Sequence, residues 1–246
     1  MLEGMIKRET LGGFFQLGRL MPGMAVRRNG RRKMYQLINA GTVLGMFLQV
    51  APAAGLAGLC YGVVRLAYLK TRRAQIRWGK EALRVVFVCY LTGLAGLVLT
   101  PRNFWSHLWG LICLGYSGTE IQFSGGSIQL VPAFVRWLSG QTTLGSWVKT
   151  MLVGNVLMFV PMGLLVPLVF CRVTAKKMLR LAVILPLAVE AVQPWIGRSF
   201  DLDDIIGNLL GILLGFALYC LAGKAAAKRK GKGQKSNICA DGGEGV

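Results

Sequence analysis

Long uncharged runs, separated by clusters of basic residues, constrain this fold more than any other feature. The uncharged runs cover residues 34–64, 85–101, 150–171 and 205–223, and a fifth run, 181–197, is interrupted only by Glu190. Crossing about 30 Å of hydrocarbon takes about 20 helical residues, so each run is a candidate membrane-spanning helix. The pattern therefore predicts an all-α, polytopic membrane protein with about five transmembrane helices.

The composition supports this prediction. Hydrophobic residues make up 54% of the chain and charged residues only 16%, whereas soluble domains carry about 25% charged residues. The net charge of +19 comes from 29 Lys and Arg against 10 Asp and Glu. Because the basic residues bracket the apolar runs, they indicate the positive-inside bias of membrane proteins and not a nucleic-acid interface. We expect the lipid bilayer as the surroundings and no nucleic-acid partner.

The basic residues also predict the orientation in the membrane. Residues 65–84 contain seven Lys and Arg, residues 172–180 contain four, and the tail from residue 224 contains six, which indicates the cytoplasmic side. Residues 102–149 contain only three and are expected outside. The first run fits less well, because a single span would leave eight basic residues of the N-terminal segment outside. A single span is favoured over a re-entrant hairpin broken at Pro52.

These boundaries divide the chain into four predicted parts: a basic N-terminal segment (1–36), an extra membrane helix with a cytoplasmic loop (37–84), a four-helix membrane domain (85–223) and a basic, disordered cytoplasmic tail (224–246). The six cysteines form no CxxC pair, and five lie in apolar runs. They are therefore expected to be small buried hydrophobic residues and not disulfides or metal ligands. The single histidine, His107, leaves little scope for an imidazole metal site.

Acidic residues carry the functional information because only ten occur, four of them between positions 190 and 204. Glu190 lies inside an apolar helix, where a carboxylate is costly unless it is protonated or paired. Gln193 follows one helical turn later, and Arg198 is close enough to approach Glu190 from the next turn. This pattern favours a polar site entered from the outer side, and a structural hydrogen bond between helices is the alternative.

The segment 198–215 continues the polar pattern onto the last span. At about 100° per residue, four side-chain positions project within about 60° of one another: Asp204, Asn208, Gly211 and Gly215. Asp201 falls at the edge of this sector and Asp203 points away. Asp201 and Asp204 are candidate ligands for a divalent cation such as Mg²⁺. The alternative is that these aspartates cap the start of the helix.

Two further features complete the candidate site and its packing. Asn155 lies near the outer end of the third span, level with the aspartates, where it would hydrogen-bond the acids or hold two helices together. The last span carries a series of small residues that lets another helix approach closely: Gly207, Gly211 and Gly215. Packing is the predicted role of these glycines, and a homo-oligomer through this helix is one way to satisfy it.

Three blocks of this sequence resemble the VanZ-like family, named for a teicoplanin-resistance membrane protein. They are GNVLMFVPMG at 154–163, ExxQ from Glu190, and DxxDxxxNxxG from Asp201 to Gly211. The resemblance covers about residues 85–223 and not the N-terminal 84. Family members also carry an Asn-Leu-x-Pro-Phe motif before the third span. Here residues 129–134 read QLVPAF, so the Asn is replaced and the Phe is displaced.

The resemblance implies a multi-pass protein of the bacterial cell membrane and a role in the cell envelope. The founding member lowers susceptibility to teicoplanin, a glycopeptide antibiotic that acts on lipid-linked cell-wall precursors. The favoured function is binding or shielding of a polyprenyl-linked precursor, with Mg²⁺ bridging its pyrophosphate to the carboxylates. The predicted ligand-binding residues are Asn155, Glu190, Gln193, Arg198, Asp201, Asp204 and Asn208.

Three other functions stay open. A structural membrane scaffold would need none of the acids for chemistry. A lipid-modifying enzyme would use Glu190 as a general acid or base. However, the sequence shows no Ser-His-Asp set or phosphate-cradling glycine loop, so no catalytic residue is assigned. A proton-coupled transporter would use Glu190, which lies in a helix between Pro186 and Pro194, as its proton carrier.

Overall fold

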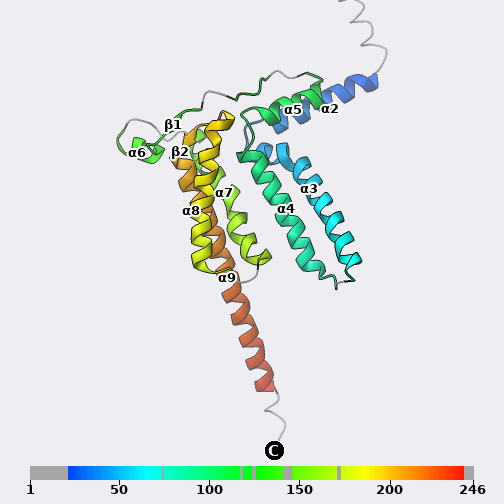
Figure 1. Ribbon diagram of the computed structural model, residues 1–246, viewed down its shortest axis with the longest axis vertical. Coiled ribbons are helices and arrows are strands. Elements are labelled where there is room, and N and C mark those ends of the chain that lie inside the picture. Colours follow the sequence, from blue (N-terminus) through cyan, green and yellow to red (C-terminus); the bar gives the residue numbers. More distant parts are fainter. Residues whose placement is uncertain are drawn as a thin grey trace, which may run out of the picture. The chain divides into compact units, whose positions relative to one another are not determined.

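The computed structural model describes residues 22–73, 75–116, 119–123, 126–140, 146–170 and 173–240. The helices over these residues are α2 (Pro22–Ile38), α3 (Val43–Thr71), α4 (Trp78–Val98), α5 (Phe104–Leu114), α6 (Ala133–Leu138), α7 (Ser146–Val169), α8 (Ala175–Val192), the 3₁₀ helix η1 (Gln193–Ile196) and α9 (Leu202–Ala240) (Figure 1). The two strands, β1 (Ile128–Gln129) and β2 (Phe200–Asp201), have two residues each.

Five segments are long and apolar enough to cross a membrane. They are Val43–Thr71, Trp78–Val98, Leu152–Val169, Ala175–Ile196 and Leu202–Ala225. Only 22–33% of the best 18-residue window of each is buried inside the protein, as expected for helices whose outer faces contact hydrocarbon. The predicted all-α architecture with about five spanning helices is therefore confirmed.

The first uncharged run is divided differently from the prediction. Residues 34–38 belong to α2, and the chain turns at Gly41, whose φ of +66° favours glycine. From Val43, α3 continues for 29 residues through Pro52. The predicted single span thus matches the structure better than a hairpin broken at Pro52, because membrane helices tolerate an internal proline when neighbouring groups satisfy the freed carbonyl.

The described residues fall into two compact units. The first joins the chain up to Ala51 with Arg102–Gln122. In it, α2 contacts α5, and Trp109 Nε1 of α5 donates a hydrogen bond to the Gln49 carbonyl at 3.1 Å. With 11 residues, α5 is too short to cross a bilayer.

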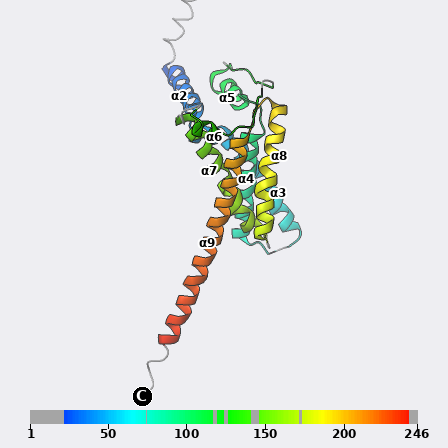
Figure 2. The same cartoon turned by 90° about the vertical axis from the view of Figure 1, so that its left-hand side faces the viewer.

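The second unit comprises Pro52–Pro101 and the described chain from Phe123. Its core lies where α9 packs against both α7 and α8, with α4 against α7 (Figures 1 and 2). The fully buried side chains in this core include Phe159, Met178 and Ile212. This three-helix packing positions the candidate site, because all three helices contribute polar residues at the same end.

Glycines let α7 and α9 approach with their backbones in contact. A Cβ atom at Gly211 would overlap the Val156 carbonyl, and one at Gly215 would overlap the Val160 carbonyl. The predicted packing face of α9 is therefore covered by α7 of the same chain. A homo-oligomer through this helix stays a prediction, and the contacts with α7 already account for Gly211 and Gly215.

Two further expectations need correction. The tail predicted to be disordered from residue 224 continues α9 as far as Ala240, because a helix that already exists extends without a new nucleation cost. Residues 241–246 lie outside the described residues. Of the four cysteines with described side chains, only Cys113 is buried, whereas Cys60 is exposed on a predicted span. Such exposed thiols are covered by lipid rather than by protein in a membrane helix.

Candidate functional site

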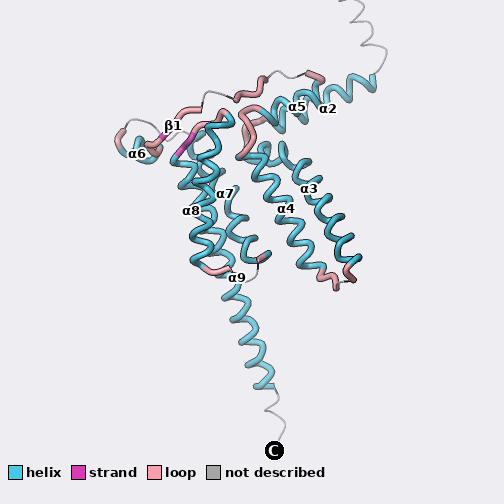
Figure 3. The backbone as a smooth tube through the Cα atoms, viewed as in Figure 1, coloured by secondary structure: helices cyan, strands magenta, loops and turns pink. Residues whose placement is uncertain are grey.

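Most of the predicted polar residues lie at one end of the second unit, where α8 ends and α9 begins. The chain leaves α8 through η1, turns at Gly197 with a φ of +75°, and enters β2 directly before α9. Figure 3 shows this loop and the paired strands beside the ends of α7 and α8. We call five side chains at this end the polar cluster: Asn155, Glu190, Asp201, Asp204 and Asn208.

Glu190 lies in the last turn of α8 and is completely buried, with 0% of its surface exposed. Its Oε2 accepts a hydrogen bond from the backbone N–H of Asp201 at 3.0 Å. Its Oε1 is buried and has no hydrogen-bond partner among the described residues. One oxygen of the carboxylate thus ties α8 to β2, while the other is left with unused accepting capacity.

Asp201 caps the start of α9, as the alternative for the aspartates predicted. Its Oδ1 accepts a hydrogen bond from the backbone N–H of Asp203 at 2.9 Å, which satisfies a donor that the first helical turn leaves unpaired. Burial raises the pKa of Asp201 above its ordinary value, although the hydrogen bond from Asp203 opposes the shift. Asp201 is therefore a structural cap held in a desolvated position.

Asn155 connects α7 to α9 through Asp204. The Asn155 amide Nδ2 donates a hydrogen bond to Asp204 Oδ1, so both residues lie at the same level, as predicted. Asn208 follows one turn later on α9, is 3% exposed, and has a buried Oδ1 without a partner in the described part of the chain. The cluster therefore contains a second acceptor, on α9, that no protein group satisfies.

Gln193 and Arg198 both make hydrogen bonds to α4, and their part in a ligand site stays a prediction. Gln193 Nε2 donates to the Val98 carbonyl at 3.4 Å, and Arg198 Nη1 donates to the Leu97 carbonyl at 2.7 Å. These carbonyls belong to the last turn of α4, where a positive charge also complements the helix dipole. Arg198 still lies near enough to act electrostatically on Glu190, but the hydrogen bonds of both side chains hold α4 in place.

The segment before α7 adds two residues that were not predicted. Strand β1 pairs in parallel with β2, which places Gln129 opposite Asp201. Arg136 of α6 donates from Nη2 to Gln129 Oε1 at 3.2 Å, and its Nε is buried without a partner among the described residues. The altered family motif at 129–134 was the only sequence signal that pointed to this loop.

The predicted Mg²⁺ site is not assembled by the side chains that the structure describes. Among them, no group of three or more His, Cys, Asp or Glu residues is placed to hold a metal ion. Asp201 accepts from a backbone amide and Asp204 accepts from Asn155. A cation at these two aspartates stays a prediction, and the donors present do not form a cage for it.

Comparison with known proteins identifies the family. No curated protein and no solved structure matches the chain. A family model described as VanZ/LLP1 matches residues 87–223, which is more than half of the 246 residues and includes every member of the polar cluster. The match confirms the resemblance seen in the sequence motifs. With its five apolar helices, the chain is a membrane protein that belongs to the VanZ/LLP1 family.

Proposed function

We propose that this protein is a non-catalytic binding protein of the cell envelope, which takes the headgroup of a polyprenyl-linked cell-wall precursor at the polar cluster. One observation carries the proposal. The buried side-chain polar atoms that lack a partner in the described residues are Glu190 Oε1, Asn208 Oδ1 and Arg136 Nε, and all belong to this end of the second unit. Each such atom costs about 1–3 kcal/mol, which a complementary ligand would recover.

The chemistry of these three atoms selects the ligand. The two oxygen atoms accept hydrogen bonds, so they suit hydroxyl or amide N–H groups, whereas the Arg136 guanidinium suits a phosphate oxygen. A lipid-linked precursor carries sugar hydroxyls, peptide amides and a pyrophosphate on one molecule, and its polyprenyl tail remains in the bilayer. Because Arg136 supplies a positive charge, this ligand does not require the bridging Mg²⁺ expected from the carboxylates alone.

The orientation predicted from the basic residues supports the same ligand. It places the loop between α4 and α7 and the turn between α8 and α9 on the outer side, where precursors are exposed to glycopeptide antibiotics. Occupation of the headgroup by this protein would compete with teicoplanin for the precursor. Lowered susceptibility to teicoplanin is then the expected consequence of binding in a bacterial host.

A structural scaffold is the competing function, favoured by the hydrogen bonds that the cluster already makes. The hydrogen bond from Asn155 to Asp204 and the one from Asp201 to Glu190 each connect two segments without a ligand. A scaffold needs these contacts and the hydrogen bond from Arg136 to Gln129, but it does not need the unpartnered Nε of Arg136. The two functions are therefore separated by measuring protection and precursor binding in Arg136→Gln beside its membrane abundance, because a scaffold contact alone would change abundance and not binding.

The test is teicoplanin susceptibility of a Gram-positive host that expresses the protein at matched membrane abundance. The wild type is expected to protect, while Glu190→Gln and Arg136→Gln are expected to abolish protection. Arg102→Gln is the matched control, because it removes the same charge from an exposed position in residues 102–149 and is expected to protect fully. A wild type that gives no protection, or protection that survives both site substitutions, would refute the proposal.

Binding itself is measured with the purified full chain in lipid nanodiscs and a fluorescent lipid-linked precursor. We expect saturable binding that persists in EDTA and weakens in Arg136→Gln. Binding that disappears in EDTA would instead favour the Mg²⁺ bridge at Asp201 and Asp204.

A further inference from the structure

A second polar arrangement lies where α3 ends and α4 begins, and it is independent of the proposed function. Here α3 contacts α4 locally, because Gly58 leaves room for the Cys89 thiol and a Cβ at Gly62 would lie 3.7 Å from Val85 Cγ2. Arg65 follows on the same face of α3, at helical spacing from both glycines. The packing therefore directs Arg65 toward α4.

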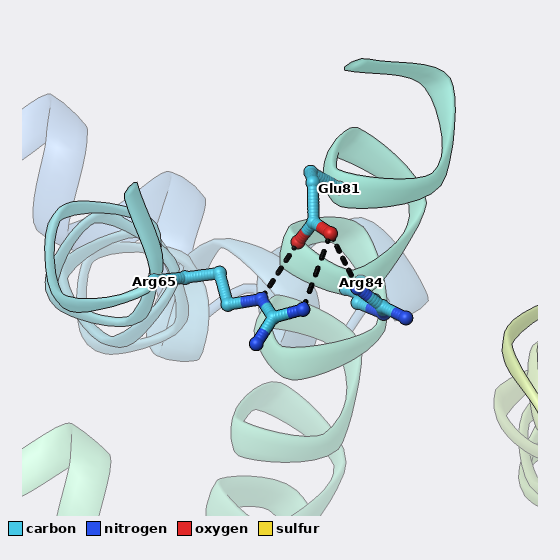
Figure 4. A network of polar contacts seen from close by, with 3 residues as sticks. All are labelled: Arg65, Glu81 and Arg84. Atoms are coloured by element: carbon cyan, nitrogen blue, oxygen red, sulfur yellow. Dashed lines mark hydrogen bonds and ion pairs between the residues drawn. The ribbon is translucent and has the colours of Figure 1, made fainter. Parts of the chain in front are cut away.

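Glu81 in the first turn of α4 holds Arg65 in a fixed orientation (Figure 4). Arg65 Nε lies 3.0 Å from Glu81 Oε2, and its Nη2 lies 3.3 Å from Oε1. Arg84 also donates to Glu81 Oε1. Such a two-point contact orients the planar guanidinium, and it uses only two of the five N–H donors of Arg65. One carboxylate thus meets two arginines, which leaves this end of the helix pair positively charged.

A shallow groove lies beside Arg65 on the surface of α3, and every residue that lines it belongs to this one helix. It has a volume of about 240 Å³ and is lined by Tyr61, Val64, Arg65 and Tyr68. Apart from the Arg65 guanidinium, its walls are aromatic rings and an aliphatic side chain. Val64 is 68% exposed and Tyr68 is 52% exposed, so the groove lies on an outer face of a predicted spanning helix. Exposed faces of candidate spanning helices are where lipid contacts are expected.

Two guanidinium groups meet at the Tyr68 ring. Arg65 Cζ lies 5.6 Å and Arg72 Cζ lies 5.8 Å from the ring centroid, within the range of a cation–π interaction. Arg72 is exposed and forms no ion pair with the acidic side chains that the structure describes. Its charge is therefore available to an anion at the mouth of the groove.

We propose that this groove binds one anionic phospholipid of the leaflet next to the 72–77 loop. The phosphate lies between Arg72 and the unused N–H groups of Arg65, and an acyl chain packs along Tyr61 and Val64. Charge complementarity favours this occupant, because residues 65–84 contain seven Lys and Arg and a single acid. Basic clusters beside a spanning helix attract anionic headgroups, and the apolar walls add a contact that free phosphate cannot use.

The experiment compares lipids retained by the full-length protein during native mass spectrometry after extraction from mixed phosphatidylglycerol and phosphatidylcholine membranes. The wild type is expected to retain one phosphatidylglycerol in preference to phosphatidylcholine. Arg72→Gln is expected to lower this affinity about fivefold, since one basic residue near the surface contributes about 1 kcal/mol. Arg77→Gln is the control, because it removes the same charge from an exposed residue of the same loop that does not line the groove.

Val64→Trp is a second variant. It fills the groove from a position that is already exposed, and it removes no charge. It is expected to reduce phosphatidylglycerol retention as well, with the thermal unfolding temperature unchanged. Three results would overturn the proposal: no preference for phosphatidylglycerol, an equal loss in Arg77→Gln, or full displacement of the lipid by millimolar inorganic phosphate. The last result would show that the arginines bind phosphate without the apolar walls.

Discussion

Substitution of Gly215 by alanine tests whether backbone contact between α7 and α9 holds the second unit together. A Cβ atom at this position would lie 3.0 Å from the Val160 carbonyl carbon and 3.1 Å from Gly163 Cα, with the Val160 oxygen closer still. Carbon atoms in optimal contact are about 3.5–4.0 Å apart. Every crowded atom belongs to the backbone, so no side-chain rotation relieves the overlap and the helices must separate.

The expected loss of stability follows from two opposing contributions. Overpacking of a well-packed contact costs about 1–3 kcal/mol, and replacing glycine by alanine inside a helix recovers about 0.5–1 kcal/mol. We therefore expect Gly215→Ala to lower the free energy of unfolding by up to about 2.5 kcal/mol. Gly154→Ala on α7 is the matched control, because nothing lies within 4 Å of its Cβ position. This control gains helix propensity without a clash.

The assay is SDS-induced unfolding of the purified full chain in detergent micelles, followed by circular dichroism. The midpoint should move to lower SDS fraction for Gly215→Ala and should stay in place or rise for Gly154→Ala. Equal midpoints for the two variants would refute the close contact between α7 and α9. A change in oligomeric state, with the monomer equally stable, would instead assign Gly215 to an interface between chains.

Three further predictions concern the polar cluster and its supports. Burial raises the folded-state pKa of Asp201 above its ordinary value of 3.8, so the folded state binds the proton more tightly than the unfolded state does. The stability gained from this proton is lost as pH rises from about 4 through the folded-state pKa. Thermal unfolding across pH should show this decline, and Asp201→Asn should remove it. Asn155→Ala leaves Asp204 without its amide donor and should lower the unfolding free energy by about 1.5–3 kcal/mol, whereas an unchanged SDS midpoint would contradict that hydrogen bond. Arg198→Gln removes the charge at the Leu97 carbonyl and should cost about 0.3–1 kcal/mol, measured by the same titration, with a more stable variant as the contrary result.

Part of the polar cluster could be predicted from helix direction alone. The spans alternate in direction, so Asn155 near the start of one span meets Asp204 at the start of another, and their hydrogen bond forms at that level. The partners of Glu190 and Arg198 could not be predicted in this way. Sequence proximity correctly brought Arg198 near Glu190, but Arg198 donates its hydrogen bond to the carbonyl of Leu97, about 100 residues away in the sequence. Such contacts depend on where α4 packs, which local spacing does not encode.

The sequence by itself determined that this is an all-α membrane protein with about five spanning helices. Backbone groups in hydrocarbon must be hydrogen-bonded within each helix, so the length of an apolar run is sufficient to identify a spanning helix. It also identified the glycine face of α9, since helical periodicity shows which residues share a face. Only the tertiary structure decided what covers each face. Gly211 and Gly215 meet α7 of the same chain, and Arg136 reaches Gln129 through a loop that has no periodicity. Periodicity describes one helix, whereas the identity of its partner depends on packing between segments that are distant in the sequence.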